Sequence, residues 1–201
     1  IILNHIFIFN TIVVICFVLA FKEFVEIVNR FKDKTVWLIF GLIYIFGSMV
    51  SLIYLRNIDS IISSPFTFLV FAGVMVNDSM AFIVGKTLGG PKILPKISPK
   101  KTYSGLFGGL VGSIIFILLC DNYFLNSFTE FSLNNTDKIF LIFVFNIVGF
   151  FGDSFESMIK RKADVKDSSG LLLGHGGMLD RLDSLILTTP VTMFYVIAYY
   201  L

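Results

Sequence analysis

The stretch that decides the fold is Val36–Leu55, which reads VWLIFGLIYIFGSMVSLIYL and contains no charged side chain. An apolar helix of about 20 residues is long enough to cross the hydrocarbon core of a bilayer. Ile139–Phe151 reaches that length if its helix continues through Gly152-Asp153-Ser154. Four other stretches come close to it: Ile6–Phe21, Pro65–Val84, Gly105–Cys120 and Leu185–Leu201. We therefore expect an all-α polytopic membrane protein with about six transmembrane helices.

The composition supports this fold class. Of the 201 residues, 56% are hydrophobic and 15% are charged, a balance too apolar for an ordinary soluble domain. Cys16 and Cys120 lie in apolar stretches without a nearby Cys or His cluster, so neither a disulfide framework nor a zinc site is expected. The expected partner is the lipid bilayer, and no nucleic acid is expected.

The placement of the basic residues predicts the orientation. Segments 22–35, 85–104 and 152–184 hold 14 of the 16 Lys and Arg residues. The positive-inside rule places such segments in the cytoplasm, and an alternation of six spans brings all three to that side. We therefore expect an integral membrane protein whose three basic segments face the cytoplasm.

The chain opens Ile1-Ile2-Leu3, with no Met and no basic segment before the first apolar run. That run is therefore not expected to be a cleavable signal peptide, and the chain is consistent with a fragment whose earlier spans are missing. We expect N-terminal transmembrane helices in residues 1–64 and a catalytic membrane domain in residues 65–201.

Segment 152–184 combines acids, bases and glycines. If the helix of the sixth span continues into it, Asp153, Ser157 and Lys160 or Arg161 share one face. An acid at the end of a span is costly and usually marks a polar pathway or an ion site. A solvated connector is the plainer alternative, and it carries about equal weight for Lys162, Asp164 and Lys166.

Gly174-His175-Gly176-Gly177 precedes the last predicted helix. Glycine backbone can approach a phosphate closely, and a helix N-terminus favours negative charge. Asp180 and Asp183 follow, one helical turn apart, and two carboxylates beside phosphates suit magnesium. If the site transfers a phosphate-containing group, His175 is a candidate donor of a hydrogen bond or proton to the phosphate that leaves. A structural role in the turn is the alternative.

A second polar cluster begins at Asp78, which lies well inside an apolar run. Burial of a charged residue there costs roughly 2.5–3.5 kcal/mol on insertion scales, so a functional role is the default. Ser98-Pro99-Lys100-Lys101-Thr102 follows. Lys100 and Lys101 fit three roles equally: topology determinants, ligands of anionic lipid headgroups, or ligands of substrate phosphates.

At these residues the sequence resembles the phosphatidate cytidylyltransferase family, also called CDP-diglyceride synthetases. The family signature runs Ser-x-x-Lys-Arg, four residues, Lys-Asp, and then His-Gly-Gly-x-x-Asp-Arg-x-Asp. It is met here by Ser157, Lys160, Arg161, Lys166, Asp167, His175, Gly176, Gly177, Asp180, Arg181 and Asp183. Leu173 departs from the pattern, because the family usually has Pro before Gly-His-Gly-Gly.

The resemblance implies a magnesium-dependent homodimeric enzyme that joins CTP to phosphatidic acid, releasing CDP-diacylglycerol and pyrophosphate. Its polar active site is expected to face the cytoplasm, and its membrane is expected to be the bacterial inner (plasma) membrane. A monovalent cation is a further candidate cofactor. The resemblance assigns Asp153 and Asp180 to metal binding, and Lys160 and Asp183 to catalysis. Together with His175, these residues form the predicted centre, and the residues predicted to bind substrate are Asp78, Ser98, Lys100, Lys101, Ser157, Arg161, Gly176, Gly177 and Arg181.

Two other functions remain as alternatives. A CTP-dependent lipid kinase of the dolichol kinase kind would transfer the γ-phosphate to a lipid alcohol. A transporter, a different class of protein, would use Asp78 and Asp153 to line a pathway through the membrane. It would also be expected to have pseudo-symmetric halves, and the sequence contains none.

Overall fold

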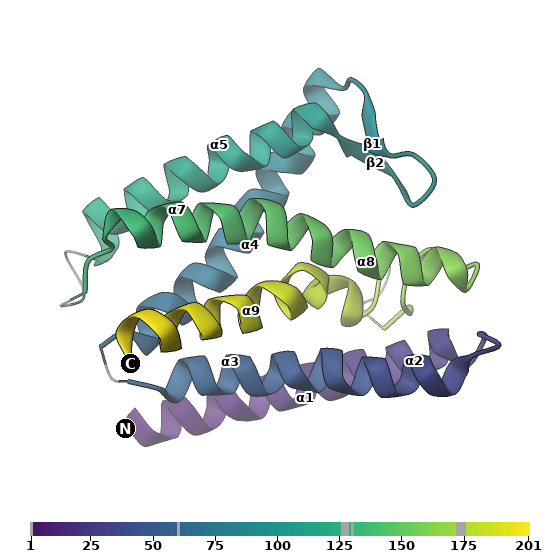
Figure 1. Cartoon of the computed structure of the whole chain (residues 1–201), viewed down its shortest axis with the longest axis horizontal. Coiled ribbons are helices and arrows are strands. Elements are labelled where there is room, and N and C mark those ends of the chain that lie inside the picture. Colours follow the sequence, from purple (N-terminus) through teal and green to yellow (C-terminus); the bar gives the residue numbers. More distant parts are fainter. Residues whose placement is uncertain (1, 60, 126–128, 130, 172–175) are drawn as a thin grey trace.

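The computed structural model describes residues 2–59, 61–125, 129, 131–171 and 176–201 (Figure 1). It is a bundle of long helices with one small hairpin of two strands. The π-helical segments η1 (Leu42–Phe46), η2 (Cys120–Leu125) and η3 (Val144–Val148) lie within longer helices. The other elements are α1 (Ile2–Val28), α2 (Lys34–Gly41), α3 (Gly47–Asn57), α4 (Ser63–Leu88), β1 (Lys92–Leu94), β2 (Ser98–Thr102), α5 (Tyr103–Leu119), α7 (Asn135–Phe143), α8 (Gly149–Lys162) and α9 (Leu179–Tyr200).

Five helical stretches of the described chain are long and apolar enough to cross a membrane, which confirms the predicted fold class: Lys34–Asn57, Ser63–Leu88, Tyr103–Leu125, Asn135–Lys162 and Leu179–Tyr200. The stretch that was short alone, Ile139–Phe151, does continue past Asp153, because α7, η3 and α8 form one helix. The first predicted span lies in α1, a helix of 27 residues that is not among these five. Its crossing of the membrane, and the division of the chain at residue 64, stay predictions.

The three basic segments meet at one end of the bundle. Figure 1 shows that α1, α4 and α8 end there, that α2, α5 and α9 begin there, and that the β1–β2 hairpin projects from it. Both chain termini lie toward the opposite end. We call the end that carries the hairpin and the three basic segments the basic end. Successive helical stretches therefore run in opposite directions, as alternating membrane spans require.

Helix α5 packs directly on α4, because its glycines have no side chain that would separate the two backbones. A Cβ at Gly108 would lie 2.4 Å from Cβ of Val84, and one at Gly112 would lie 2.6 Å from Cγ of Met80. Small residues allow such close packing of helices in a membrane. This close packing fixes the part of α4 that carries Asp78.

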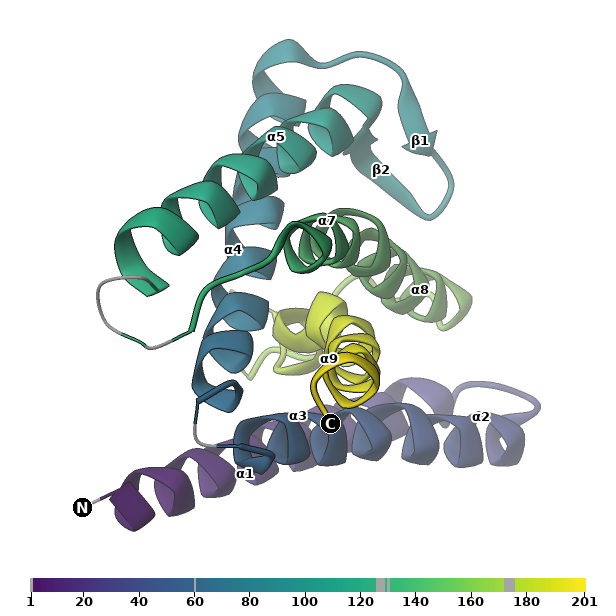
Figure 2. The same cartoon turned by 60° about the vertical axis from the view of Figure 1, so that its left-hand side comes forward.

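Helix α9 occupies the middle of the bundle, between the layer of α1 and α3 and the layer of α7 and α8 (Figure 2). Its buried hydroxyls donate hydrogen bonds to carbonyls one turn earlier in the same helix, from Thr188 to Ser184 at 3.0 Å and from Thr192 to Thr188 at 2.9 Å. Polar atoms in a low-dielectric core need such partners. The buried threonines of α9 are thus all hydrogen-bonded, and the N-terminus of the helix points to the basic end.

The arrangement of the helices yields a prediction about topology. In a variant whose two native cysteines are replaced, Lys96→Cys in the exposed hairpin and Ser132→Cys at the opposite end should be labelled by a membrane-impermeant thiol reagent from opposite sides of the membrane. Labelling in intact and in permeabilised cells measures this. If both positions react from the same side, the six-span alternation is wrong.

Candidate active site

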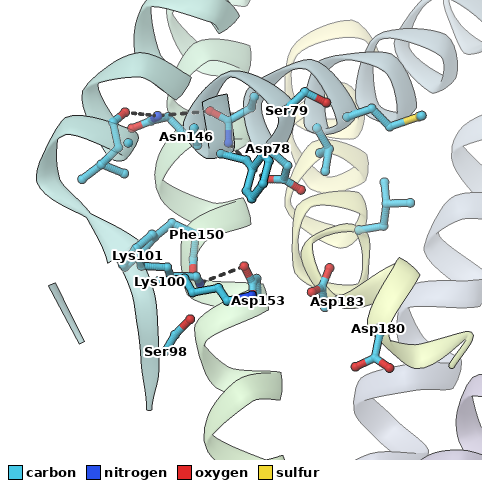
Figure 3. A pocket seen from close by; sticks show the side chains of 18 of the residues that line it. Asp78, Ser79, Ser98, Lys100, Lys101, Asn146, Phe150, Asp153, Asp180 and Asp183 are labelled. Atoms are coloured by element: carbon cyan, nitrogen blue, oxygen red, sulfur yellow. Dashed lines mark hydrogen bonds and ion pairs between the residues drawn. The ribbon is translucent and has the colours of Figure 1, made fainter. Parts of the chain in front are cut away.

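A cavity of about 660 Å³ lies at the basic end, between α4, β2, α8 and α9 (Figure 3). It brings together the two polar clusters, which are about 75 residues apart in sequence. The predicted site residues that line it are Asp78, Ser98, Lys100, Lys101, Asp153, Asp180, Arg181 and Asp183.

Three of the acids face this cavity from three different helices. Figure 3 shows Asp153 on α8 and Asp183 on α9 on opposite sides of it, with Asp78 on α4. Asp183 lies close enough to Asp153, Glu156 and Asp78 to interact with their charges. Asp78 accepts long hydrogen bonds, of 3.3 Å each, from Asn77 Nδ2 and Ser184 Oγ. It remains exposed to the cavity, which explains how an acid inside an apolar run can be solvated.

Lys101 provides the positive charge on the wall opposite Asp183. Its Nζ lies 2.9 Å from Asp153 Oδ2, donates to Ser154 Oγ at 2.7 Å, and stands 4.5 Å from the ring centre of Phe150. The β1–β2 pairing and the N-cap of α5, in which Thr102 accepts from the Gly105 N–H at 3.0 Å, fix this position. The β1–β2 hairpin folds back onto α8 and so places Lys101 at the cavity.

Asp180 has a different environment from Asp183, although the two are one turn apart. Its Oδ1 accepts from Lys160 Nζ at 2.5 Å. Its Oδ2 accepts from the Gly177 N–H at 2.7 Å, and from the N–H and hydroxyl of Ser168 at 2.9 and 2.8 Å. In contrast, the one donor to Asp183 among the described residues is the Ser184 N–H at 2.6 Å. Protein donors thus surround Asp180, while Asp183 keeps an oxygen directed toward the cavity.

Lys160 is not among the residues that line the cavity. It is buried between α8 and α9, where its Nζ lies 2.6 Å from Glu156 Oε2 and binds Asp180. Glu156 is only 3% exposed. Apart from this ion pair, its carboxylate oxygens accept no hydrogen bond from the described residues. Lys160 therefore joins the two acid-bearing helices, and its direct catalytic role stays a prediction.

The other predicted residues that the structure describes lie around the cavity rather than in its wall. Ser157 donates to Asp153 Oδ1 at 3.3 Å, and Arg161 donates to the carbonyls of Ile97 and Val165 at 3.2 and 2.9 Å. Gly176 has a φ of +79°, and a Cβ there would lie 2.6 Å from Asp180 Oδ2. The glycine at this position is thus explained by a carboxylate of the protein itself. His175 lies outside the described residues.

Sequence reasoning missed several polar residues of the site. The amide of Asn146, within η3, donates to Asn77 Oδ1 at 3.1 Å and to the Leu106 carbonyl at 3.0 Å, which joins three helices behind Asp78. Glu156 was missed as well, although it follows Asp153 by one turn and precedes Lys160 by four residues, a spacing typical of ion pairs. Asn146 offered the signal of an amide within an apolar span.

The carboxylates of the cavity are candidate ligands of a divalent cation. The described part of the chain contains no group of three or more His, Cys, Asp and Glu residues close enough to hold an ion. Magnesium does not require one, because it usually takes one or two carboxylates together with waters and substrate phosphates. Asp153 and Asp183, facing each other, fit this requirement. Asp180 fits it less well, because four donors already engage its carboxylate.

A family model described as "Cytidylyltransferase family" matches residues 1–199 of the chain. The chain belongs to this family. It is 34% identical to a phosphatidate cytidylyltransferase of Rickettsia bellii over 185 residues, 89% of this chain and 78% of that protein. It is 31% identical to one of Bacillus subtilis over 81% of this chain and 58% of that protein. It is 42% identical to the chloroplastic phosphatidate cytidylyltransferase 4 of Arabidopsis thaliana over 65% of this chain and 32% of that protein. The match thus spans about a third of the plant protein.

The contrast between the two aspartates of α9 yields a prediction. Asp183→Asn should lower kcat by about 100-fold or more and change thermal unfolding little, because its carboxylate serves the cavity rather than the fold. Asp180→Asn should lower both activity and melting temperature, because its amide group cannot accept from all four donors; the stability loss should be about 1–3 kcal/mol. Kinetics and thermal unfolding in detergent measure both. Equal melting temperatures for the two variants would contradict this division of roles.

Proposed function

We propose that this protein transfers the cytidylyl group of CTP to phosphatidic acid. The observation that carries the proposal is the amphiphilic cavity, whose polar part gathers acids and bases at the basic end and whose other wall is an apolar face of α4. A cavity of this size lies within the range of small-molecule sites. One substrate of the reaction is a nucleotide and the other is a lipid with an anionic headgroup, so both kinds of wall are needed.

The apolar wall suits the lipid substrate. Phe71, Val74, Met75 and Phe82 line the cavity from α4. Met75 is 67% exposed and Phe82 is 61% exposed on a helix long enough to cross the membrane. Large apolar side chains exposed on such a helix face lipid. The cavity is therefore bounded by side chains that also border the bilayer, and a lipid can enter from there without leaving its acyl chains in water.

The polar wall requires a cation. Asp78, Asp153 and Asp183 would repel the phosphates of CTP and phosphatidic acid, because charges interact strongly where little water separates them. Lys100, Lys101 and Arg181 supply positive charge on other parts of the wall. We propose that Asp153 and Asp183, together with substrate phosphates, would hold magnesium, which would supply charge neutralisation and polarisation at the reacting phosphoryl group.

The chemistry then needs mainly positioning. A phosphate oxygen of phosphatidic acid attacks the α-phosphorus of CTP, and the bond to the bridging oxygen breaks, so that pyrophosphate leaves. Such transfers depend on alignment and charge neutralisation more than on covalent help from the protein. Lys101 approaches the phosphates from β2, while Asp180 and Lys160 fix the start of α9 relative to α8. His175 stays a candidate donor to the pyrophosphate.

Two further features belong to the proposal. The cavity faces the cytoplasm, because the basic residues gather at the same end of the bundle and CTP is a cytoplasmic nucleotide. The membrane is then the bacterial plasma membrane. The functional unit is a homodimer, which the family resemblance implies.

The reaction is tested with CTP labelled at one phosphorus at a time. Purified protein, magnesium and phosphatidic acid should move the label of the α-phosphate into lipid and release the γ-label as pyrophosphate, and the Asp183→Asn variant should do both about 100-fold more slowly or worse. In a parallel assay that supplies a polyprenol in place of phosphatidic acid, the dolichol kinase kind of reaction would instead move the γ-label into that lipid alcohol and release CDP. A transporter would label no lipid. Either of these outcomes would overturn the proposal.

A further inference from the structure

Helix α9 carries Asp180, Arg181 and Asp183 in its first turns, yet its own sequence provides no side-chain cap. Met178 occupies the N-cap position, and no side chain there accepts a hydrogen bond. The first N–H groups of a helix lack partners within the helix, and leaving them unpaired in a buried place is costly. The N–H groups of Met178 and Leu179 instead donate to Glu23, at 3.0 and 2.8 Å.

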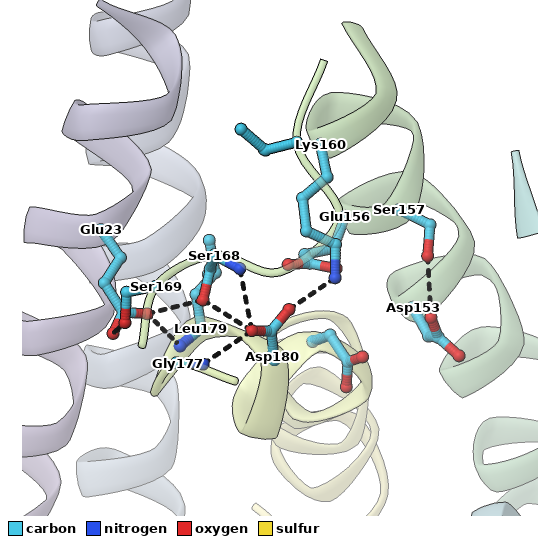
Figure 4. Close-up of polar contacts among 12 residues, drawn as sticks. Glu23, Asp153, Glu156, Ser157, Lys160, Ser168, Ser169, Gly177, Leu179 and Asp180 are labelled. Atoms are coloured by element: carbon cyan, nitrogen blue, oxygen red, sulfur yellow. Dashed lines mark hydrogen bonds and ion pairs between the residues drawn. The ribbon is translucent and has the colours of Figure 1, made fainter. Parts of the chain in front are cut away.

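Glu23 belongs to α1, about 155 residues earlier in the chain, and it is only 4% exposed. Each of its carboxylate oxygens lies within hydrogen-bond distance of two donor groups. Oε1 accepts from the Ser169 hydroxyl at 2.6 Å and from the Met178 N–H. Oε2 accepts from the Leu179 N–H and lies 2.8 Å from the Ser168 hydroxyl, whose one proton it shares with Asp180. Figure 4 shows this carboxylate between α1, the segment that precedes α9, and the first turn of α9.

Ser168 connects Glu23 to Asp180. Its hydroxyl lies 2.8 Å from an oxygen of each carboxylate, and its N–H donates to Asp180 at 2.9 Å. Gly177 closes the same network, because a Cβ there would lie 2.3 Å from Glu23 Oε2 and 2.1 Å from Ser168 Oγ. Asp180 in turn binds Lys160 on α8. The chain of contacts therefore runs from α1 through Ser168 and Asp180 to α8.

We infer that Glu23 is a positioning residue of the active site, which holds the start of α9 and, through Ser168, the carboxylate of Asp180. The inference rests on the proposed function. Glu23 does not line the cavity of about 660 Å³, so it acts on the reaction through α9 rather than by touching a substrate there. Positioning groups of this kind affect activity by about 10- to 100-fold when removed.

The negative charge and the four acceptor sites of Glu23 both matter. A carboxylate at a helix N-terminus interacts favourably with the helix dipole. A glutamine has the same shape but only one acceptor oxygen, and its amide hydrogens would face donors. Because α9 would then begin in a slightly different place, Asp183 would be misaligned toward the reacting phosphates. Misalignment lowers the rate of a bound complex more than it weakens binding.

The experiment compares Glu23→Gln and Ser168→Ala with a control, Glu26→Gln, which removes the same charge from an exposed position one turn later on α1. The measurements are kcat and KM for CTP and for phosphatidic acid, together with hydrogen exchange of the amides at 177–180 in the purified protein. We expect Glu23→Gln to lower kcat by about 10- to 100-fold with KM values within about threefold, and to speed amide exchange at the start of α9. The control should match the wild type in all three.

The double variant, with both Glu23→Gln and Ser168→Ala, distinguishes a positioning role from a merely structural one. If Glu23 acts through Ser168, the kcat losses of Glu23→Gln and Ser168→Ala should be far from multiplicative. Unchanged kcat in Glu23→Gln, a loss confined to KM, or multiplicative losses would each overturn the inference. If the wild type makes no CDP-diacylglycerol, the proposed function fails instead. Hydrogen exchange then still decides whether Glu23 holds the start of α9.

Discussion

The excess of carboxylates inside a membrane-embedded bundle is the constraint on which the rest of this structure depends. Three helices bring these acids to the basic end, with Lys101 and Lys160 as the cations paired to them. Each acid lies where charge is expensive unless it is paired, hydrogen-bonded or hydrated. The acids concerned are Asp78, Asp153, Glu156, Asp180 and Asp183. Their positions must therefore be held by the surrounding packing.

Several features of the fold serve this purpose. The glycines of α5 let α4 approach closely, and the amide of Asn146 joins α4 to α5 and to η3 behind Asp78. The hairpin brings Lys101 onto Asp153. The buried threonines of α9 satisfy their hydroxyls within the helix, so that α9 can run through the centre of the bundle. The acids thus converge on a cavity without unfolding the helices that carry them.

The sequence predicted the helices and much of the cavity wall, because apolar runs and acids at span ends are signals local to the chain. The continuation of the sixth span through Asp153 could be predicted for the same reason. Contacts between distant segments could not be predicted. Glu23 is one charge among several in a basic segment, and the sequence position of Lys101 fits three roles equally. Their partners lie far along the chain: Ser168 is 145 residues from Glu23, and Ser154 is 53 residues from Lys101.

The fixed gaps of the family signature have a physical explanation in these contacts. Gly177 lies three residues before Asp180 because its N–H donates to that carboxylate across the first turn of α9. The same turn leaves Asp183 rotated away from these donors, so it faces the cavity. Lys160 then has to stand where one ammonium group reaches Asp180 on α9 and Glu156 on its own helix. The residues of the signature therefore have two kinds of role. Gly177, Lys160 and Asp180 hold the start of α9 in place, and Asp183 is the carboxylate that is left to face the substrates.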